Sequence, residues 1–178
     1  RVAKENLVQA ETLWTMLRRH DAFPQAEFYD AWRWIQLGSE HTWGYMDPAQ
    51  PIARKIEATK ASYFENASKT AKELLAKSVQ PIVKPGSDTI AVLNTLSWSR
   101  TGLAVLTREQ SKAGDGVVND DKSPVPSQRL STGELVFLAG QIPAFGSRVF
   151  RVRPEVLVEE SWPTAKAVGH VLDNSLVQ

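Results

Sequence analysis

Apolar residues recur at every third or fourth position between Lys4 and Ser78. An α-helix has 3.6 residues per turn, so this spacing places apolar side chains on one face and predicts amphipathic helices. The expected helices run from Lys4 to Arg19, from Pro24 towards Gly38, and from Ala49 to Ser78. Short links between three such helices favour an antiparallel three-helix bundle.

Each expected helix has one apolar stripe that we expect to be buried in the bundle. The stripes consist of Leu7, Ala10, Leu13, Trp14, Met16 and Leu17 in the first helix, Phe28, Ala31, Trp32 and Ile35 in the second, and Ile52, Ile56, Thr59, Tyr63, Ala67, Ala71 and Leu74 in the third.

The hydrophobic period changes from about 3.6 to 2 after the segment Pro81 to Asp88, whose prolines and glycine stop helix formation. We expect a strand ending near Trp98, a turn at Ser99 to Gly102, and a returning strand from Leu103 to Leu106. Further strand candidates are Val117-Val118, Val125 to Arg129, Leu135 to Leu138, Arg148 to Val152 and Val168 to Val177. The polar tract from Glu109 to Gly133 is expected to hold one or two weak edge strands.

These patterns predict an α+β chain of two domains. The first is a three-helix domain at residues 1–82, and the second is an incomplete antiparallel β-sandwich-like domain at residues 83–178. The sequence begins with Arg1 inside a helical pattern and without an initiator Met, so we expect it to be a piece of a longer protein.

The composition of the sequence argues against several classes of function. The 178 residues include 21 basic and 20 acidic side chains without a block of like charge, which argues against nucleic acid or an acidic membrane as partner. The absence of cysteine excludes disulfides and thiolate metal sites. No apolar run is long enough to suggest a membrane-spanning helix.

The stretch from Gly38 to Pro48 combines an acid, an imidazole, a hydroxyl, an indole and a phenol at the end of the second helix. Either the glycine or the proline alone is enough to end a helix. The additional polar and aromatic groups therefore indicate a surface that contacts a substrate, a metal ion or another domain.

His41 is the residue in this stretch best suited to bind a metal, because a neutral imidazole is a good zinc ligand. A catalytic zinc needs about three protein ligands, and neither Glu40 nor Asp47 is placed to complete such a site with it. His20 lies about 25 Å away along the second helix, and nothing places His170 nearby. From the residues alone, His41 is either a ligand of a shared metal or a helix-end histidine bonded to a carbonyl.

Catalytic motifs are otherwise missing from the sequence. It has no nucleophile elbow, phosphate-binding glycine loop or dinucleotide fingerprint. Glu40 and Asp47 have no helical spacing that would fix the separation of a glycosidase carboxylate pair. Trp43 and Tyr45 either stack on a sugar or close the end of the bundle against a neighbouring domain.

Three sequence pieces in the same order resemble glycoside hydrolase family 38, the α-mannosidases. They are Glu40-His41-Thr42-Trp43-Gly44, then Asn94-Thr95-Leu96-Ser97-Trp98 with Arg100-Thr101-Gly102, and Ile142-Pro143-Ala144-Phe145-Gly146 before a strand. The similarity extends from about Lys4 to Gln178, and it is to the helical middle domain and the start of the C-terminal β region of the family.

The resemblance implies a zinc-dependent retaining exo-mannosidase. In this family the zinc is held by carboxylates and a histidine of an N-terminal catalytic domain together with one histidine of the middle domain, which corresponds to His41. The catalytic carboxylates belong to the N-terminal domain, which is absent from this sequence, so no catalytic residue is expected here. The implied partners are that domain and a mannose-containing glycan.

One position departs from the family. Many members have an acid directly after the metal-binding histidine, and here that position is Thr42. A hydroxyl can hydrogen-bond to a sugar but supplies no negative charge, which puts substrate preference and activity in question. Thr42, Trp43 and Tyr45 are the candidate substrate-binding residues.

The sequence therefore predicts a fragment of an α-mannosidase that is inactive alone. Two other interpretations remain open. The chain is either a stand-alone carbohydrate-binding or structural scaffold module, or a family homologue that has lost activity. The fragment reading predicts that His41 lies exposed at one end of the bundle without two other protein ligands nearby. It also predicts unusual exposure of Trp43, Tyr45 and Met46, because the domain they contact is missing.

Overall fold

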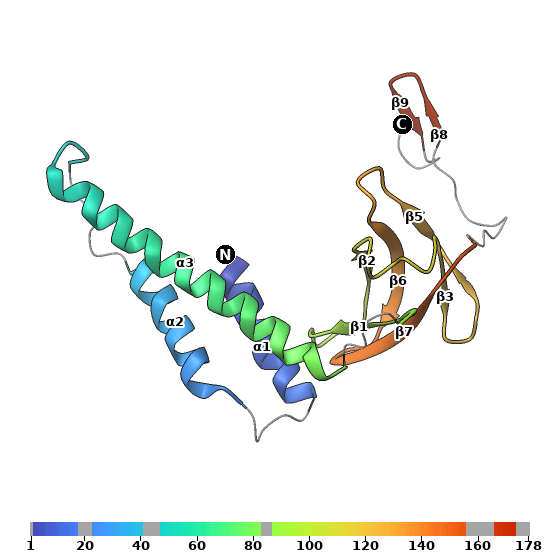
Figure 1. Cartoon of the computed structure of the whole chain (residues 1–178), viewed down its shortest axis with the longest axis horizontal. Coiled ribbons are helices and arrows are strands. Elements are labelled where there is room, and N and C mark those ends of the chain that lie inside the picture. Colours follow the sequence, from blue (N-terminus) through green and yellow to red (C-terminus); the bar gives the residue numbers. More distant parts are fainter. Residues whose placement is uncertain (1, 18–22, 41–46, 83–86, 156–165, 174–178) are drawn as a thin grey trace. The chain divides into compact units, whose positions relative to one another are not determined.

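A computed structural model describes residues 2–17, 23–40, 47–82, 87–155 and 166–173. The chain divides into two compact units, Arg1–Val83 and Lys84–Gln178. Helices make up the first unit and strands make up the second (Figure 1). The domain boundary expected from the sequence, between residues 82 and 83, lies one residue before this division.

The described residues of the helical unit form three α-helices and a short 3-10 turn. Their bounds are α1 Val2–Met16, α2 Gln25–Ser39, α3 Pro51–Val79 and η2 Gln80–Ile82. The proline at the first position of α3 is favourable because its missing N–H would have no partner in the helix. The longest helix, α3, contacts both α1 and α2, and it is the element that holds the unit together (Figure 1).

Small residues allow the helices to pack closely around one buried cluster. Its members are Leu7, Ala10 and Trp14 of α1, Phe28 and Ala31 of α2, and Ala71 and Leu74 of α3. Most of the stripe predicted for α1 and α2 is therefore confirmed as core. Phe23, just before α2, stacks on Phe28 with ring centroids 4.8 Å apart and closes this end of the cluster.

The stripe predicted for α3 is wrong in its first half. Ile52 is 56% exposed and Thr59 is also exposed, whereas Ala53 is buried. Neighbouring positions on a helix differ by about 100°, so a shift of one residue turns the larger side chain away from the other helices.

In the part of the second unit that the structure describes, antiparallel strands form three sheets. The strands are β1 Thr89–Asn94, β2 Arg100–Leu106, β3 Gly116–Asn119, β4 Pro124–Val125, β5 Ser127–Arg129, β6 Leu135–Ile142, β7 Gly146–Arg153, β8 Lys166–Val168 and β9 Val171–Asp173. One sheet has the order β1-β7-β3-β4, the second has the order β2-β6-β5, and β8 pairs with β9. The α+β class and the antiparallel pairing predicted from the sequence are confirmed.

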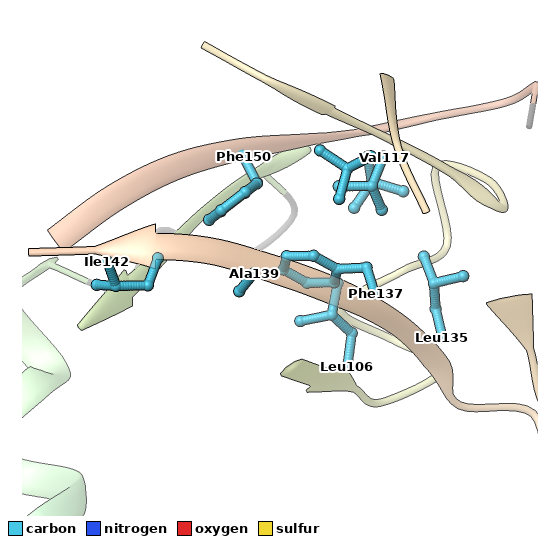
Figure 2. Packing of buried hydrophobic residues seen from close by; sticks show 9 residues of the cluster. Leu106, Val117, Leu135, Phe137, Ala139, Ile142 and Phe150 are labelled. Carbon is cyan, nitrogen blue, oxygen red and sulfur yellow. The ribbon is translucent and has the colours of Figure 1, made fainter. Parts of the chain in front are cut away.

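Side chains from both larger sheets share one hydrophobic cluster. It contains Leu106, Val117, Val125, Leu135, Phe137, Ala139, Ile142, Phe150 and Val152. In Figure 2, Phe150 and Val117 point from the four-stranded sheet towards Phe137 and Ala139 of β6. The rings of Phe137 and Phe150 lie 5.0 Å apart at a tilt of 56°, a favourable arrangement for two aromatic side chains.

The hairpin predicted between the first two strands is wrong. β1 ends at Asn94 instead of near Trp98, and it pairs with β7, whereas β2 pairs with β6 in the other sheet. The Asn94 side chain accepts a hydrogen bond from the backbone N–H of Leu96 at 3.0 Å and donates to the carbonyl of Trp98 at 2.7 Å. These local bonds replace strand pairing and end β1.

Two other strand predictions need correction. The tract from Glu109 to Gly133 contains the expected short edge strands, β4 and β5, but it also contains β3, an interior strand whose Val117 and Val118 are buried. The expected strand at Val168 to Val177 is instead the β8–β9 hairpin as far as Asp173. Gly169 turns the chain there with a φ of 62°, a left-handed conformation that glycine adopts without a steric penalty.

Among the residues that the structure describes, no helix is both long enough and apolar enough to cross a membrane.

Candidate functional site

The candidate site lies where α2 ends. Glu40 caps the helix with an extended backbone, φ −62° and ψ 142°, and its N–H donates to the carbonyl of Gln36 at 2.8 Å. Residues 41–46 fall outside the described part of the chain, so His41, Thr42, Trp43, Tyr45 and Met46 cannot be placed. Their predicted roles and exposure remain predictions.

Gly38 lies within α2 instead of beyond its end. A Cβ atom at this position would lie 2.8 Å from Cζ of Phe64 in α3, which is shorter than ordinary van der Waals contact. Glycine therefore allows the two helices to approach each other immediately before the candidate segment. Position 38 therefore holds a glycine because α3 lies close to it. The glycine does not end α2, which continues to Ser39.

Lys60 of α3 anchors the last residue of the α2 cap. Its Nζ donates to the backbone carbonyl of Glu40 at 3.1 Å and lies 3.3 Å from Oε1 of the Glu40 side chain. The two side chains are 25% and 41% exposed, so an ion pair of this kind contributes only about 0–1 kcal/mol. The contact nevertheless links the C-terminal cap of α2 to α3.

On the other side of the segment, Asp47 begins the turn into α3. Its Oδ1 accepts a hydrogen bond from the backbone N–H of Ala49 at 2.9 Å, and its carbonyl accepts one from the N–H of Gln50 at 3.2 Å. This is the local side-chain bonding by which aspartate stabilises turns. Glu40 and Asp47 thus have separate structural partners on two sides of the segment.

No three His, Cys, Asp or Glu side chains lie close enough to hold a metal ion in the described part of the chain. His170 is exposed in the turn between β8 and β9, and His20 falls outside the described residues. The described residues therefore do not make a metal site by themselves.

Two exposed carboxyls in the second unit have shifted pKa values. Hydrogen bonds from the side chain and backbone of Ser123 lower the pKa of Asp121, and the hydroxyl of Thr132 lowers the pKa of Glu134. A general acid acting near neutral pH needs a raised pKa, so these shifts point to turn stabilisation and away from acid catalysis.

A groove of about 420 Å³ runs along α2 and reaches the candidate segment. It is lined by Tyr29, Trp32, Arg33, Gln36, Leu37 and Glu40. Trp32 was expected only as part of the apolar stripe of the second helix, and Tyr29, Arg33 and Gln36 were not predicted as site residues. Their spacing of three and four positions, which puts them on one helix face, was the signal available in the sequence.

Two of the sequence pieces that resemble the mannosidases meet in the second unit. The Nδ2 amide group of the buried Asn94 contacts the carbonyls of Ile142 and Pro143 at 3.2 and 3.0 Å, and the N–H of Phe145 donates to the carbonyl of Leu96 at 2.9 Å. These contacts join the end of β1 to the turn between β6 and β7. They give the two pieces a structural role.

No family model and no curated protein matches the sequence. Among solved structures, the fold is similar to a crystal structure of a protein in glycosyl hydrolase family 38 from Enterococcus faecalis. The alignment has a TM-score of 0.55 and 10% sequence identity, and it covers 89% of this chain. The chain spans only 24% of the length of that protein. At this identity the likeness establishes a similar fold.

Proposed function

We propose that the chain is the helical middle domain and the start of the β region of a longer zinc-dependent retaining α-mannosidase. The observation that carries the proposal is the fold likeness to a family 38 glycosyl hydrolase over 89% of the chain. A match this extensive takes in residues of both the helical and the strand unit, in one chain order. The sequence pieces that resemble the α-mannosidases point to the same family independently of the fold.

The proposal includes a β-sandwich-like domain beginning at residue 83. Its support is the single hydrophobic cluster to which β2, β3, β4, β6 and β7 all contribute. Two antiparallel sheets that bury side chains against each other are the basis of sandwich folds.

In this account His41 supplies one imidazole nitrogen to the zinc. The proposal assigns the other zinc ligands to an N-terminal domain, because a catalytic zinc needs about three protein ligands. When bound, the zinc would act as a Lewis acid towards hydroxyls of the terminal mannose. The Glu40 cap and its contact with Lys60 hold the residue that precedes His41 in the sequence.

Thr42, Trp43 and Tyr45 would contact the terminal sugar. The threonine hydroxyl offers one neutral hydrogen-bonding group, and the two aromatic rings offer apolar faces with polar edges. A retaining glycosidase also needs two carboxyl groups about 5–5.5 Å apart. The proposal assigns both to the N-terminal catalytic domain, so this chain alone hydrolyses nothing.

The test compares the longer protein with this chain on an aryl α-mannoside, with and without a chelator. The expected result is hydrolysis by the longer protein, loss of hydrolysis with the chelator, recovery on adding zinc, and no hydrolysis by the chain alone. Hydrolysis that persists in the chelator, or activity of the isolated chain, would contradict the proposal.

A further inference from the structure

The sheet formed by β2, β6 and β5 has apolar side chains on its outer face. Leu103 and Val105 alternate along β2 with the residues that pack in the hydrophobic cluster, so they lie on the opposite face, and they are 72% and 61% exposed. The register places Leu138 of β6 opposite Leu103 and Val136 opposite Val105. Leu138 is 40% exposed and Val136 is half-buried. We call these four neighbouring side chains the outer patch.

The pattern of β2 is that of a strand covered on both faces. An antiparallel sheet with one face in water usually alternates between apolar residues inside and polar residues outside. In β2 the inner residues Ala104 and Leu106 are apolar, and so are the outer residues Leu103 and Val105. The side chains of the outer patch also have no polar group that could hydrogen-bond to water. The sequence of this strand therefore suits a second covering layer.

β2 is also an edge strand among the strands that the structure describes, because the sheet order is β2-β6-β5. Edge strands are commonly protected by charged residues or proline, but residues 101–106 contain neither. The irregularity of β2 lies at its start, between Arg100 and Gly102, and leaves the stretch that carries the outer patch regular. The unpaired backbone groups of an open edge are matched by an added strand. A β segment is therefore the cover that fits both features.

The outer patch is too small to hold a separate molecule. A stable interface between proteins buries about 800 Å² on each partner and uses about 20–30 residues a side, whereas the outer patch offers four apolar side chains. Association of separate molecules also costs about 4–15 kcal/mol of translational and rotational freedom. A segment of the same chain avoids most of this cost, because the covalent link gives it a high effective concentration. These terms favour a cover from the same protein over a second copy.

We propose that the outer patch is covered by a β segment from the part of the β region that follows residue 178 in the longer protein. This segment packs apolar side chains on Leu103, Val105 and Leu138 and pairs with the open edge of β2. The inference rests on the proposed function, which makes this chain only the start of the β region. The structurally similar glycosyl hydrolase extends well beyond the matched part, since the chain spans 24% of its length.

Because the sequence has no cysteine, single thiols report whether the outer patch is accessible. Leu103→Cys and Leu138→Cys are made in the 178-residue chain and in the longer protein, and alkylation of each thiol is followed on its own peptide by mass spectrometry. Both thiols should react freely in the 178-residue chain. In the longer protein they should react about a hundredfold more slowly, because reaction then requires local opening. Ala113→Cys, at an exposed position in the turn before β3, is the matched control and should react equally in both proteins.

A substitution that preserves shape tests the same cover without a thiol. Threonine has nearly the shape of valine and also favours strands, so Val105→Thr should leave the urea midpoint of β2 unchanged in the 178-residue chain, where this position is exposed. In the longer protein it should lower the midpoint, because the hydroxyl would lie against apolar side chains. The midpoint is followed by hydrogen exchange of the peptides that contain β2. An unchanged midpoint in both proteins would contradict the proposal.

Crosslinking identifies the covering segment. Gln128 of β5 lies opposite Val136 on the same face, so a photo-crosslinking amino acid in its place reaches whatever covers the outer patch. We expect crosslinks to peptides that follow residue 178. Crosslinks to a region that precedes Arg1 would overturn the proposal, because the cover would then come from a different domain.

Three labelling results would also overturn it. Equal, fast labelling in both proteins would mean that the outer patch has no cover, slow labelling in the monomeric 178-residue chain would place the cover within this chain, and protection that appears on dimerisation would identify a second copy. The proposed function is read separately, from chelator-sensitive hydrolysis of an aryl α-mannoside by the longer protein. Hydrolysis with a reactive thiol at position 103 refutes only the inference, and a protected thiol without such hydrolysis refutes only the proposed function.

Discussion

The side-chain amide of Asn94 donates a hydrogen bond to the backbone carbonyl of Pro143 over a distance of 3.0 Å. The same Nδ2 group lies 2.7 Å from the carbonyl of Trp98, and Oδ1 accepts from the N–H of Leu96. Asn94 is only 5% exposed, so these bonds satisfy polar groups that water reaches poorly. One asparagine thus links two turns that are far apart in the sequence.

Replacing Asn94 should destabilise the second unit. Asn94→Ala removes the donors and leaves buried carbonyls without partners, which should lower the free energy of unfolding by about 1–3 kcal/mol. Asn94→Asp should cost more at neutral pH, because a carboxylate oxygen would face the carbonyls of Trp98, Ile142 and Pro143. Urea denaturation followed through amide signals of β1 and β7 measures both changes. Equal stability of Asn94→Ala and the unaltered chain would show that these bonds contribute nothing.

The contact between Gly38 and Phe64 predicts a coupling between α2 and α3. Alanine favours a helix over glycine by about 0.5–1 kcal/mol, but its Cβ would lie 2.8 Å from the Phe64 ring. Gly38→Ala should therefore be stabilising in a Phe64→Ala background and less favourable in the unaltered chain. A double-mutant cycle by chemical denaturation, followed on α2 signals, measures the difference. Additive effects of the two substitutions would mean that the ring moves aside without cost.

Arg129 should be the most important charged residue of the second unit. Its Nε and Nη2 donate to Oδ1 of Asp115 at 2.8 and 2.6 Å, and its guanidinium also reaches the carbonyls of Ser111, Gly114 and Gly133. A lysine has no planar fork, so Arg129→Lys should lose most of these bonds and about 1.5–3 kcal/mol of stability.

The exposed pair of Lys112 and Glu109 provides the control for Arg129. These side chains are 57% and 79% exposed, and Lys112→Ala should change the free energy of unfolding by no more than about 0.5 kcal/mol. If Arg129→Lys were as mild as Lys112→Ala, the bonds of Arg129 would not stabilise the tract between β2 and β6.

Asp121 should titrate below its ordinary pKa of 3.8. The hydroxyl and the backbone N–H of Ser123 donate to Oδ1 of Asp121 at 2.6 and 2.9 Å, and these bonds favour the ionised form. Because folding lowers this pKa, the resulting stability is present above pH 3.8 and is lost as the pH falls through the pKa of the folded state.

An NMR pH titration checks this pKa. Ser123→Ala should raise the pKa of Asp121 and leave that of Glu134 in place, because Glu134 is bonded to Thr132 instead. A midpoint for Asp121 at or above 3.8 in the unaltered chain would contradict the assignment.

The hydrophobic periodicity of the sequence predicted the helices well and the sheets only in part. The hydrophobic period of 3.6 identified α1, α2 and α3 and most of their buried residues. An amphipathic helix can be recognised from one continuous segment, because its apolar residues recur every three or four positions. Strand pairing depends on distant partners, and alternation near residue 90 contains no information that β1 pairs with β7. The turn made by Asn94 uses side-chain bonds that no hydrophobic pattern reports.

The sequence predicted one part of the candidate site and missed another. The sequence drew attention to Gly38 to Pro48, and the structure explains Gly38, Glu40 and Asp47 through helix packing, a cap and a turn. The groove on α2 was missed because exposure of Tyr29 depends on which helix faces are covered by neighbours, which spacing alone does not determine.

Zinc content of the longer protein with His41 replaced by alanine, measured beside a His20→Ala control, tests whether His41 is a zinc ligand. We expect about one zinc ion per chain in the unaltered protein and in His20→Ala, and substantial loss of both zinc and α-mannosidase activity in His41→Ala. Full zinc content and full activity in His41→Ala would show that this residue is not a ligand.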